Sequence, residues 1–295
     1  MRVAVCVAVQ RNLAPTAALQ GSDLPLEPRR DDPWARPDPP ARPARALLIA
    51  GDQAGSPGTP TPGAMAALAV VASDLQLRFA SAGVEIETLC TAPTKQHVMT
   101  GFAKLLTTVR PNDLLVVMFA GHGKEPDPRD AQPAQAWSLT DDQDFTDLEL
   151  ATALLAFPTG VDVVVICDCC YGEGFFEAGA VLPERLQRLR DTRDRAWQDV
   201  ANNSPMVCIS AASDVGQVTL TKLVELANDT VAAAAAGHSY AQLATTFDQN
   251  KLTGREFHVD ARPAERLGDA VLSTTATPPG ARASEAVCAA RHNRG

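Results

Sequence analysis

The feature that most restricts the fold of this chain is a series of short, almost wholly apolar runs separated by amphipathic helical patterns. Strands that are apolar along their whole length are typical of parallel sheets, because helices cover both faces of such sheets. The sequence therefore predicts an α/β fold with a mostly parallel central sheet that is flanked by helices on both faces. The runs are ALLIAG (46–51), DLLVVMFAGHG (113–123), VDVVVIC (161–167) and PMVCISAAS (205–213).

Between these runs, apolar residues recur three or four positions apart, which is the spacing of a helix with one buried face. The first such pattern begins at Ala64 and stops at Gly83, and the following VEIETL (84–89) alternates like a strand. Proline-rich GSPGTPTPG (55–63) is predicted to be a loop. Trp137 and Trp197 are interpreted as packing residues. Further helices are predicted at 96–109, 147–157 and 220–237.

Composition divides the chain into three parts. Residues 1–45 contain a strand candidate, MRVAVCVAVQ, and then a proline-rich and charged insertion. The candidate strand also fits the apolar part of a signal peptide, but its short length favours the strand. Residues 46–270 form the main predicted domain. Residues 271–295 are weakly patterned and are predicted to be a weakly ordered tail.

Charge and cysteine content exclude several classes of protein. A net charge of −9 argues against a nucleic-acid partner, because such proteins usually have a basic face. We find no run of eighteen apolar residues, so no membrane partner is expected. The seven cysteines are odd in number, and three of them cluster at 167, 169 and 170. This pattern indicates reduced thiols in a cytoplasmic protein.

Two predicted strands end in side chains that are suited to catalysis. One ends in Gly121-His122-Gly123, and the other continues into Asp168-Cys169-Cys170. Ligands bind beyond the carboxyl ends of parallel strands, so an imidazole and a thiol meet there if the two strands are neighbours. A nearby histidine converts a thiol into a nucleophilic thiolate. The backbone amides of Gly123 and Cys170 are candidate donors to an oxyanion.

These two motifs resemble those of the caspase and metacaspase superfamily. DLLVVMFAGHG is similar to its histidine motif, and VVVICDCCYGEG (163–174) is similar to its cysteine motif. Cys170 follows His122 by 48 residues, and caspase-type cysteines follow their histidine by about 50. ASDLQLRFASAGVEIETL (72–89) and VCISAASDVGQV (207–218) also resemble segments of the family, so the resemblance covers roughly residues 46 to 250.

The resemblance implies a caspase-like fold and a cysteine endopeptidase of metacaspase type that acts on polypeptide substrates. It implies that Cys170 is the nucleophile, that His122 is the acid and base, and that Cys169 is a bystander. Asp168 and Asp74 match two acids of the pocket that receives the residue before the cut bond. Two carboxylates in a partly desolvated pocket favour arginine or lysine at that position.

Some residues depart from the family pattern, and other features are open to two interpretations. Tyr171, Gly172-Glu173-Gly174 and Ala120 differ from the usual motif residues. No cofactor is required for the chemistry, but the resemblance implies a calcium site. The candidate ligands are Asp141 and Asp147. They belong to an acidic cluster that also contains Asp142 and Asp144. The alternative is a solvated loop with helix caps.

The arginine-rich segment 183–200 corresponds to the intersubunit linker that many relatives cut during activation, so self-cleavage there is a hypothesis. Its alternative is a solvated helix with internal ion pairs.

Two rival functions remain after this reading. The chain is alternatively an inactive caspase-like scaffold that binds partners, or a cysteine hydrolase that acts on small esters or amides. For the clustered thiols, a zinc site made by Cys167, Cys169 and Cys170 is an alternative role, but no second ligand pair follows at a zinc-like spacing. The oligomeric state is left open.

Overall fold

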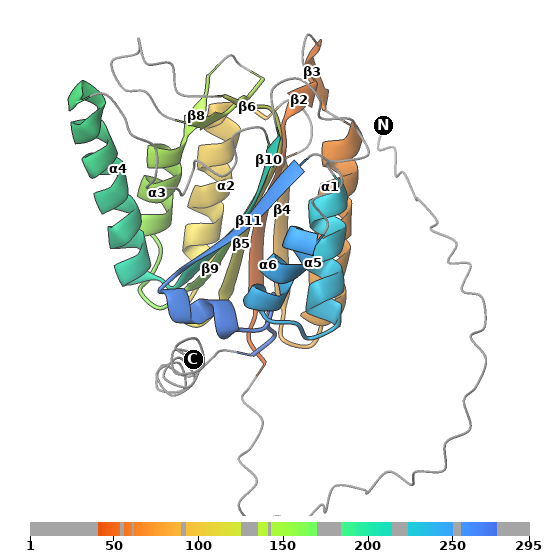
Figure 1. Ribbon diagram of the computed structural model, residues 1–295. Coiled ribbons are helices and arrows are strands. Elements are labelled where there is room, and N and C mark those ends of the chain that lie inside the picture. The colour runs from red at the N-terminus through yellow and green to blue at the C-terminus, as the bar shows by residue number, and fades with distance from the viewer. Residues whose placement is uncertain are drawn as a thin grey trace, which may run out of the picture. The chain divides into compact units, whose positions relative to one another are not determined.

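The computed structural model describes residues 41–53, 56–60, 62–89, 93–124, 135–140, 143–169, 184–213, 224–249 and 255–275, all within the unit Pro39–Gly295. In this unit a six-stranded sheet lies between two layers of helices (Figure 1). The predicted α/β class, with a mostly parallel central sheet, is confirmed.

The sheet has the strand order β11-β10-β9-β5-β1-β4. Five strands are parallel, and β11 pairs with β10 in the antiparallel direction. Parallel neighbours place their carboxyl ends at one edge of the sheet, which is called the rim below. The strands are β1 (Ala44–Ala50), β4 (Val84–Leu89), β5 (Leu114–Gly121), β9 (Asp162–Cys169), β10 (Met206–Ser213) and β11 (Arg255–Arg262).

Two hydrophobic cores lie on the two faces of this sheet. Successive strand residues point to opposite faces. Val164 and Ile166 of β9 therefore join one core, and Val163 and Val165 join the other. The central strands read as continuous apolar runs because both of their faces are buried. One face is covered by α1 (Pro62–Arg78), α5 (Glu225–Ala235) and α6 (Tyr240–Gln249), and the other by α2 (Lys95–Thr108), α3 (Asp147–Leu155) and α4 (Glu184–Asn203), as Figure 1 shows.

The structure differs from the sequence prediction in its short and polar elements. The predicted loop 55–63 contains β3 (Ser56–Pro60), which pairs with β2 (Asp52–Gln53). The chain after His122 also forms a small antiparallel sheet, which the sequence pattern does not predict. Short strands rely on backbone pairing more than on apolar periodicity, so they leave little signal in the sequence. The strands of the small sheet are β6 (Gly123–Lys124), β7 (Ala136–Trp137) and β8 (Phe145–Thr146).

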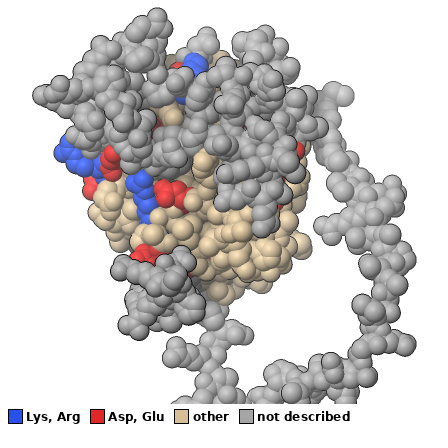
Figure 2. Space-filling model, in the orientation of Figure 1, with Lys and Arg blue, Asp and Glu red and all other residues tan. Residues whose placement is uncertain are grey.

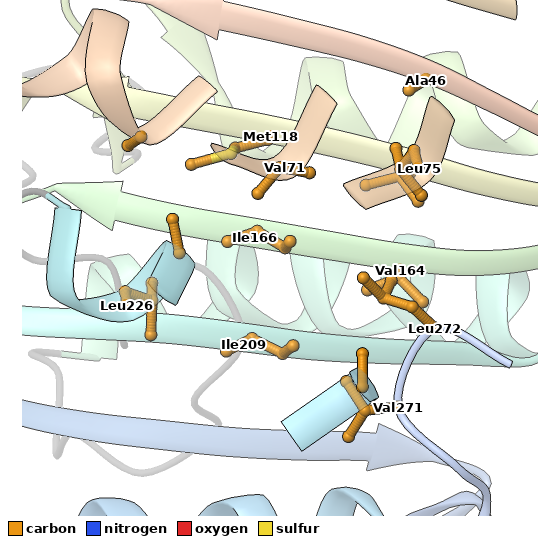
Figure 3. Packing of buried hydrophobic residues seen from close by; sticks show 14 of the residues in the cluster. Ala46, Val71, Leu75, Met118, Val164, Ile166, Ile209, Leu226, Val271 and Leu272 are labelled. Carbon is orange, nitrogen blue, oxygen red and sulfur yellow. The ribbon is translucent and has the colours of Figure 1, made fainter. Parts of the chain in front are cut away.

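The predicted tail 271–295 begins too early. Val271 and Leu272 are fully buried, and Figure 3 shows them among Val164 and Ile209 in the core under α5. Apolar burial of these two side chains explains why the segment up to 275 belongs to the fold. Residues 276–295 and the predicted strand candidate in 1–40 lie outside the described residues.

A buried ion network closes the sheet at the edge opposite the rim. Asp162, at the start of β9, forms ion pairs with both Arg42 and Arg266. The Arg266 side chain also binds Asp269, with an Nε–Oδ2 distance of 2.9 Å. The Nε of Arg42 donates a hydrogen bond of 2.9 Å to the carbonyl of Ser273. The network therefore joins the start of β1, the start of β9 and the segment after β11.

The exposed surface carries charges of both signs. Figure 2 shows basic and acidic side chains next to one another in places. Beside them lies a broad area of uncharged residues. Three surface pairs join neighbouring elements: Lys95–Glu149, Lys104–Glu87 and Lys124–Asp144. None of the helices that the structure describes is both long and apolar enough to cross a membrane.

Asp162→Ala is expected to reduce the free energy of unfolding by about 3–5 kcal/mol, because the change removes the carboxylate that Arg42 and Arg266 share and leaves the buried Arg42 without an anion. Urea denaturation followed by circular dichroism measures this loss. The control is Glu85→Ala, which removes the surface pair between Glu85 and Arg45 and is expected to cost about 1 kcal/mol or less. Equal losses in the two variants would contradict a stabilising role for the buried network.

Candidate functional site

His122 lies at the rim, directly after β5, and its side chain is half-buried. The backbone is held on both sides of this residue. On one side, Gly121 packs against the end of β1. On the other side, Gly123 pairs with Trp137 of β7, and the Ser138 N–H donates a hydrogen bond of 2.9 Å to the His122 carbonyl. The position of the histidine is therefore defined by neighbouring strands rather than by a free loop.

Gly121 is required by close backbone packing. A Cβ atom added to Gly121 would lie 2.7 Å from the Cα of Gly51, and real Cβ atoms essentially never approach so closely. The Gly51 N–H donates a hydrogen bond of 2.8 Å to the Ala120 carbonyl, which keeps the ends of β1 and β5 together. Gly121 therefore permits direct contact between two chain segments.

The two motif strands are direct neighbours, which meets the condition on which the expected meeting of imidazole and thiol depends. β5 and β9 are parallel, with Ala120 opposite Asp168 and Gly121 opposite Cys169. Adjacent strands lie about 4.8 Å apart. The residue before His122 therefore lies beside the residue before Cys170. Cys170 itself lies outside the described residues, so the thiol–imidazole distance stays a prediction.

Asp168 is fully buried at the rim, with 0% of its surface exposed. Alternation along β9 places it on the same face as Val164 and Ile166, which is the face covered by α1 and α5. Its neighbours in register are Ala120 on β5 and Ala211 on β10. The carboxyl group is thus flanked by two small side chains on the two adjacent strands.

Cys167 and Cys169 lie on the opposite face of β9, where both are buried in the core under α2, α3 and α4. Burial raises the pKa of the Cys167 thiol; a hydrogen bond from the Trp137 side chain opposes this rise, and nearby Asp168 adds to it. Burial likewise raises the pKa of Cys208. A buried protonated thiol is a poor nucleophile. Among the described residues, no group of three His, Cys, Asp or Glu side chains is placed to hold a metal.

The structure does not bring Asp74 to the rim. The helix α1 begins at Pro62 beside the end of β1 and runs toward the opposite edge, where its last turn leads to β4 (Figure 1). Asp74 lies twelve residues along it, about 18 Å from its start at 1.5 Å per residue. There it pairs with Arg78, with an Nε–Oδ2 distance of 3.5 Å. Burial raises the pKa of Asp74, and Arg78 partly opposes this rise.

Arg78 connects this end of α1 to the rest of the fold, because it donates hydrogen bonds to the carbonyls of Ala234 and Leu272. Asp74 therefore belongs to an interhelical contact at the far edge, and its predicted place in a pocket with Asp168 is not supported. The position of an acid within a helix pattern carries no information about which end of the sheet it reaches.

Two members of the acidic cluster are described. Asp144 pairs with Lys124 at 2.7 Å, and Asp147 is buried in the first turn of α3, where its Oδ1 accepts a hydrogen bond of 2.7 Å from the Leu148 N–H. Thr146 and Glu149 form a capping box around it. These contacts are those of the helix-cap alternative. Asp141, the other predicted calcium ligand, and Asp142 lie outside the described residues.

The backbone of the arginine-rich segment is helical from Glu184 to Asn203, as the solvated-helix alternative predicts. Trp197 and Val200 attach the second half of this helix to the core. The side chains of 184–193 lie outside the described residues, and self-cleavage in this segment stays a prediction.

The sequence reasoning identified Trp137 as a packing residue, which its complete burial confirms, but missed its link to the site. The indole stacks on Phe119 of β5, with ring centroids 4.8 Å apart and an angle of 5° between the planes. A buried aromatic residue within an otherwise polar segment was the available signal. Nothing in the sequence shows which strand such a residue contacts.

A parallel sheet that carries a histidine and a cysteine motif at adjacent strand ends is the arrangement of an α/β cysteine hydrolase. Residues 76–178 of the chain match the family model of the metacaspase, peptidase C14 domain. The match includes both motifs, and it confirms the predicted resemblance to the caspase and metacaspase superfamily. This part of the chain is therefore similar to the peptidase domain of metacaspases. Asp74 lies outside the matched residues.

The solved structures that are similar to the chain include the following three. A structural-genomics target from Geobacter sulfurreducens has 19% identity and a TM-score of 0.49, and the match covers 82% of this chain and 96% of that one. Caspase-1 from Spodoptera frugiperda has 9% identity, a TM-score of 0.46, and coverage of 75% and 87%. The Drosophila initiator caspase Dronc has 8% identity, a TM-score of 0.44, and coverage of 77% and 81%. No curated protein sequence matches the chain.

Gly121→Ala is expected to lower the free energy of unfolding by roughly 1–3 kcal/mol, because the added methyl group must displace the backbone of Gly51. Chemical denaturation measures the change. The control is Gly268→Ala, where nothing lies within 4 Å of the added atom and the expected change is within about 0.5 kcal/mol. An unchanged midpoint for the Gly121 variant would contradict the close contact between β1 and β5.

Proposed function

We propose that the chain is an active cysteine endopeptidase of caspase and metacaspase type, which cleaves polypeptides after arginine or lysine through Cys170 and His122. The register of β5 against β9 is the observation that carries the proposal. It sets Gly121 opposite Cys169, so the next residue on each strand is a member of the catalytic pair. The peptidase family match supports protein substrates.

A working pair requires the Cys170 sulfur and the His122 imidazole to lie on one face of the sheet. Chain connectivity favours this, because the Cα of Cys170 lies about 3.8 Å from that of Cys169 across a trans peptide bond. Side chains alternate along a strand, so the face of Asp168 is the expected face for Cys170. Cys169 points into the opposite core, which supports its role as a bystander.

The proposed reaction is acyl transfer. His122 takes the proton of Cys170, and the thiolate attacks the scissile carbonyl carbon. The backbone amides of Gly123 and Cys170 stabilise the oxyanion. The imidazolium then gives its proton to the leaving amine as the carbon–nitrogen bond breaks. Water hydrolyses the resulting thioester with His122 as the base, which releases the acid product and restores the thiol.

The sequence predicted two acids, Asp168 and Asp74, in the specificity pocket. We assign the specificity for a basic residue to Asp168 only. Asp168 lies at the rim, two residues before Cys170, and its register neighbours on both adjacent strands are alanines. A carboxylate in such a site favours a guanidinium or ammonium group. Asp74 has no part in this proposal, because it lies toward the far end of α1.

Calcium activation and self-cleavage within 183–200 are further parts of the proposal. Calcium would be held by Asp141. Asp147 has a structural role instead, because it contacts the N-terminus of α3. Cleavage within the helical backbone of α4 would require local unfolding before a substrate-like extended segment is presented. The cytoplasmic location stays a prediction.

Cys170→Ala is expected to reduce the cleavage of fluorogenic peptides ending in arginine or lysine by roughly four orders of magnitude or more, because the nucleophile is lost. The measurement is kcat/KM for purified full-length protein, with and without calcium. His122→Ala is expected to give a similar loss. The matched control is Cys169→Ala, which removes a thiol one residue away and is expected to keep activity within about threefold.

The same assay separates the rival functions. Absence of turnover of any peptide or small ester by the wild-type protein would favour the inactive scaffold. Cleavage of small esters without peptides would favour a small-molecule hydrolase. Cleavage after aspartate alone would overturn the basic specificity, and a full-length wild-type protein that cleaves peptides in the presence of calcium would exclude obligatory self-processing.

Asp168→Asn is expected to lower kcat/KM for arginine peptides about tenfold to a hundredfold, because the neutral amide loses the charge-assisted hydrogen bond. The ratio of arginine to uncharged peptides at the same position reports specificity without depending on enzyme concentration. Asp74→Asn is the control, and its ratio is expected to match that of the wild type. A changed ratio for Asp74→Asn alone would place the specificity pocket elsewhere.

A further inference from the structure

We infer that Trp137 is a positioning residue that holds His122 and the end of β9 at their working separation. This inference rests on the proposed function of the pair His122 and Cys170. Trp137 lies fifteen residues after the histidine and is separated from it in the chain by a segment outside the described residues. The contacts of the indole and of the β7 backbone reach both motif strands.

The first contact is with the strand that carries the histidine. The indole stacks face to face on Phe119, three residues before His122 on β5, with ring centroids 4.8 Å apart. The Phe119 ring in turn lies beneath the crossing of the two glycines. A Cβ atom added to Gly51 or Gly121 would lie 3.0 or 3.1 Å from its Cζ atom. The stack therefore supports the backbone directly before His122.

The second contact is with the backbone that follows the histidine. Trp137 pairs with Gly123 in the antiparallel ladder of β6 and β7. The N–H of the next residue, Ser138, donates a hydrogen bond of 2.9 Å to the His122 carbonyl. A shift of the indole would move β7, and with it the partner of that carbonyl. The segment 121–123 is thus held before and after the histidine by contacts that converge on Trp137.

The third contact is with the strand that carries the cysteine motif. The register places Cys167 of β9, three residues before Cys170, directly opposite Phe119, on which the indole stacks. The Trp137 side chain also interacts with the Cys167 thiol and lowers its pKa, against the effect of burial. Phenylalanine would keep a ring on Phe119 but would lack the indole N–H.

Further aromatic rings pack against the indole and restrict its movement. Phe145 of β8 lies 5.5 Å from it, and Phe102 of α2 lies 6.1 Å from Phe145, measured between ring centroids. Trp137 is fully buried, so no solvent-filled space adjoins the indole into which it can rotate. A close-packed aromatic stack transmits strain rather than absorbing it. The structure therefore has the rigidity that a positioning role needs.

The central test compares Trp137→Phe with Trp197→Phe. Trp197 is almost as completely buried in the same core, but it lies on α4 and not in the small sheet that follows His122. We expect kcat for arginine peptides to fall about tenfold to a hundredfold in the Trp137 variant with little change in KM, because small displacements of a reacting group cost rate rather than binding. Trp197→Phe is expected to lose a similar amount of stability and to keep kcat within about twofold. Thermal unfolding of both variants measures that stability.

A second readout does not depend on peptide cleavage. The rate at which iodoacetamide alkylates Cys170, followed by peptide mass spectrometry over a range of pH, reports when the thiolate forms. We expect the wild-type midpoint to lie below the ordinary thiol pKa of about 8.5, and His122→Ala to abolish that displacement. Trp137→Phe is expected to move the midpoint toward the ordinary value, and Trp197→Phe to leave it unchanged.

The outcomes distinguish the inference from the proposed function. A wild type that cleaves no peptide but shows these alkylation shifts would refute the peptidase and support the positioning role. Equal midpoints in wild type and Trp137→Phe would overturn the inference, as would an equal shift in Trp197→Phe or a wild-type midpoint that His122→Ala leaves unchanged.

A variant on the other side of the stack keeps the test decisive if Trp137→Phe fails to fold. Phe119→Leu removes the ring that packs against Gly51 and Gly121 and leaves the indole in place, and we expect it to reproduce the shift of the alkylation midpoint. Its control is Phe157→Leu, which alters a ring that packs on Phe102 away from the rim. Equal alkylation midpoints in these two variants would overturn the inference.

Discussion

The hydrogen-bonded register between β5 and β9 is the constraint on which the site depends. Two parallel strands exchange backbone hydrogen bonds at a fixed spacing, so a slip of one residue would carry every side chain to the other face. Here both faces of both strands are buried, and such a slip would exchange Val116 and Val164 with neighbours that fill a different core. Among the residues that the structure describes, the packing of 29 buried residues on one side and 26 on the other thus determines which residues lie next to each other at the rim.

The rim combines rigid and polar elements in a small space. The backbones of Gly51 and Gly121 meet directly, with no side chain between them, and an aromatic stack supports them from below. On the opposite face, the buried carboxyl group of Asp168 lies between two alanines. A buried acid is costly, and residues of this kind are more frequent at functional sites than elsewhere. The two faces of one strand end therefore serve different purposes, one apolar and structural and the other polar.

The sequence predicted the long apolar elements well, because burial on both faces leaves an unmistakable run of side chains. VEIETL was predicted at the residues where β4 lies. The adjacency of the histidine and cysteine strands was only a condition of the sequence argument, and the structure supplies it. β11 was missed because it is an edge strand, with charged residues such as Asp260 and Arg262 among its apolar ones. The small sheet β6-β7-β8 was missed because two-residue strands have no periodicity.

The candidate site was only partly predictable for a related reason. Motifs give the identity and order of residues, and parallel topology adds the edge at which strand ends meet. A residue on a helix lacks this topological marker, which is why Asp74 was assigned to the rim although it pairs with Arg78 toward the far edge. The contacts of Trp137 with Phe119 and Cys167 depend on how a segment folds back over the sheet, and no local pattern encodes that path.

The arrangement of α4 has a consequence for the continuity of the chain. This helix connects β9 to β10, but it contributes no backbone hydrogen bond to the sheet. A single severed peptide link in its first turns would leave the whole ladder of six strands intact. The two resulting pieces would still be joined by the pairing of β9 with β10 and by the ion pair of Asp162 with Arg266. In each case one partner precedes the break in the chain and the other follows it. Covalent integrity and structural integrity are thus separable at this helix.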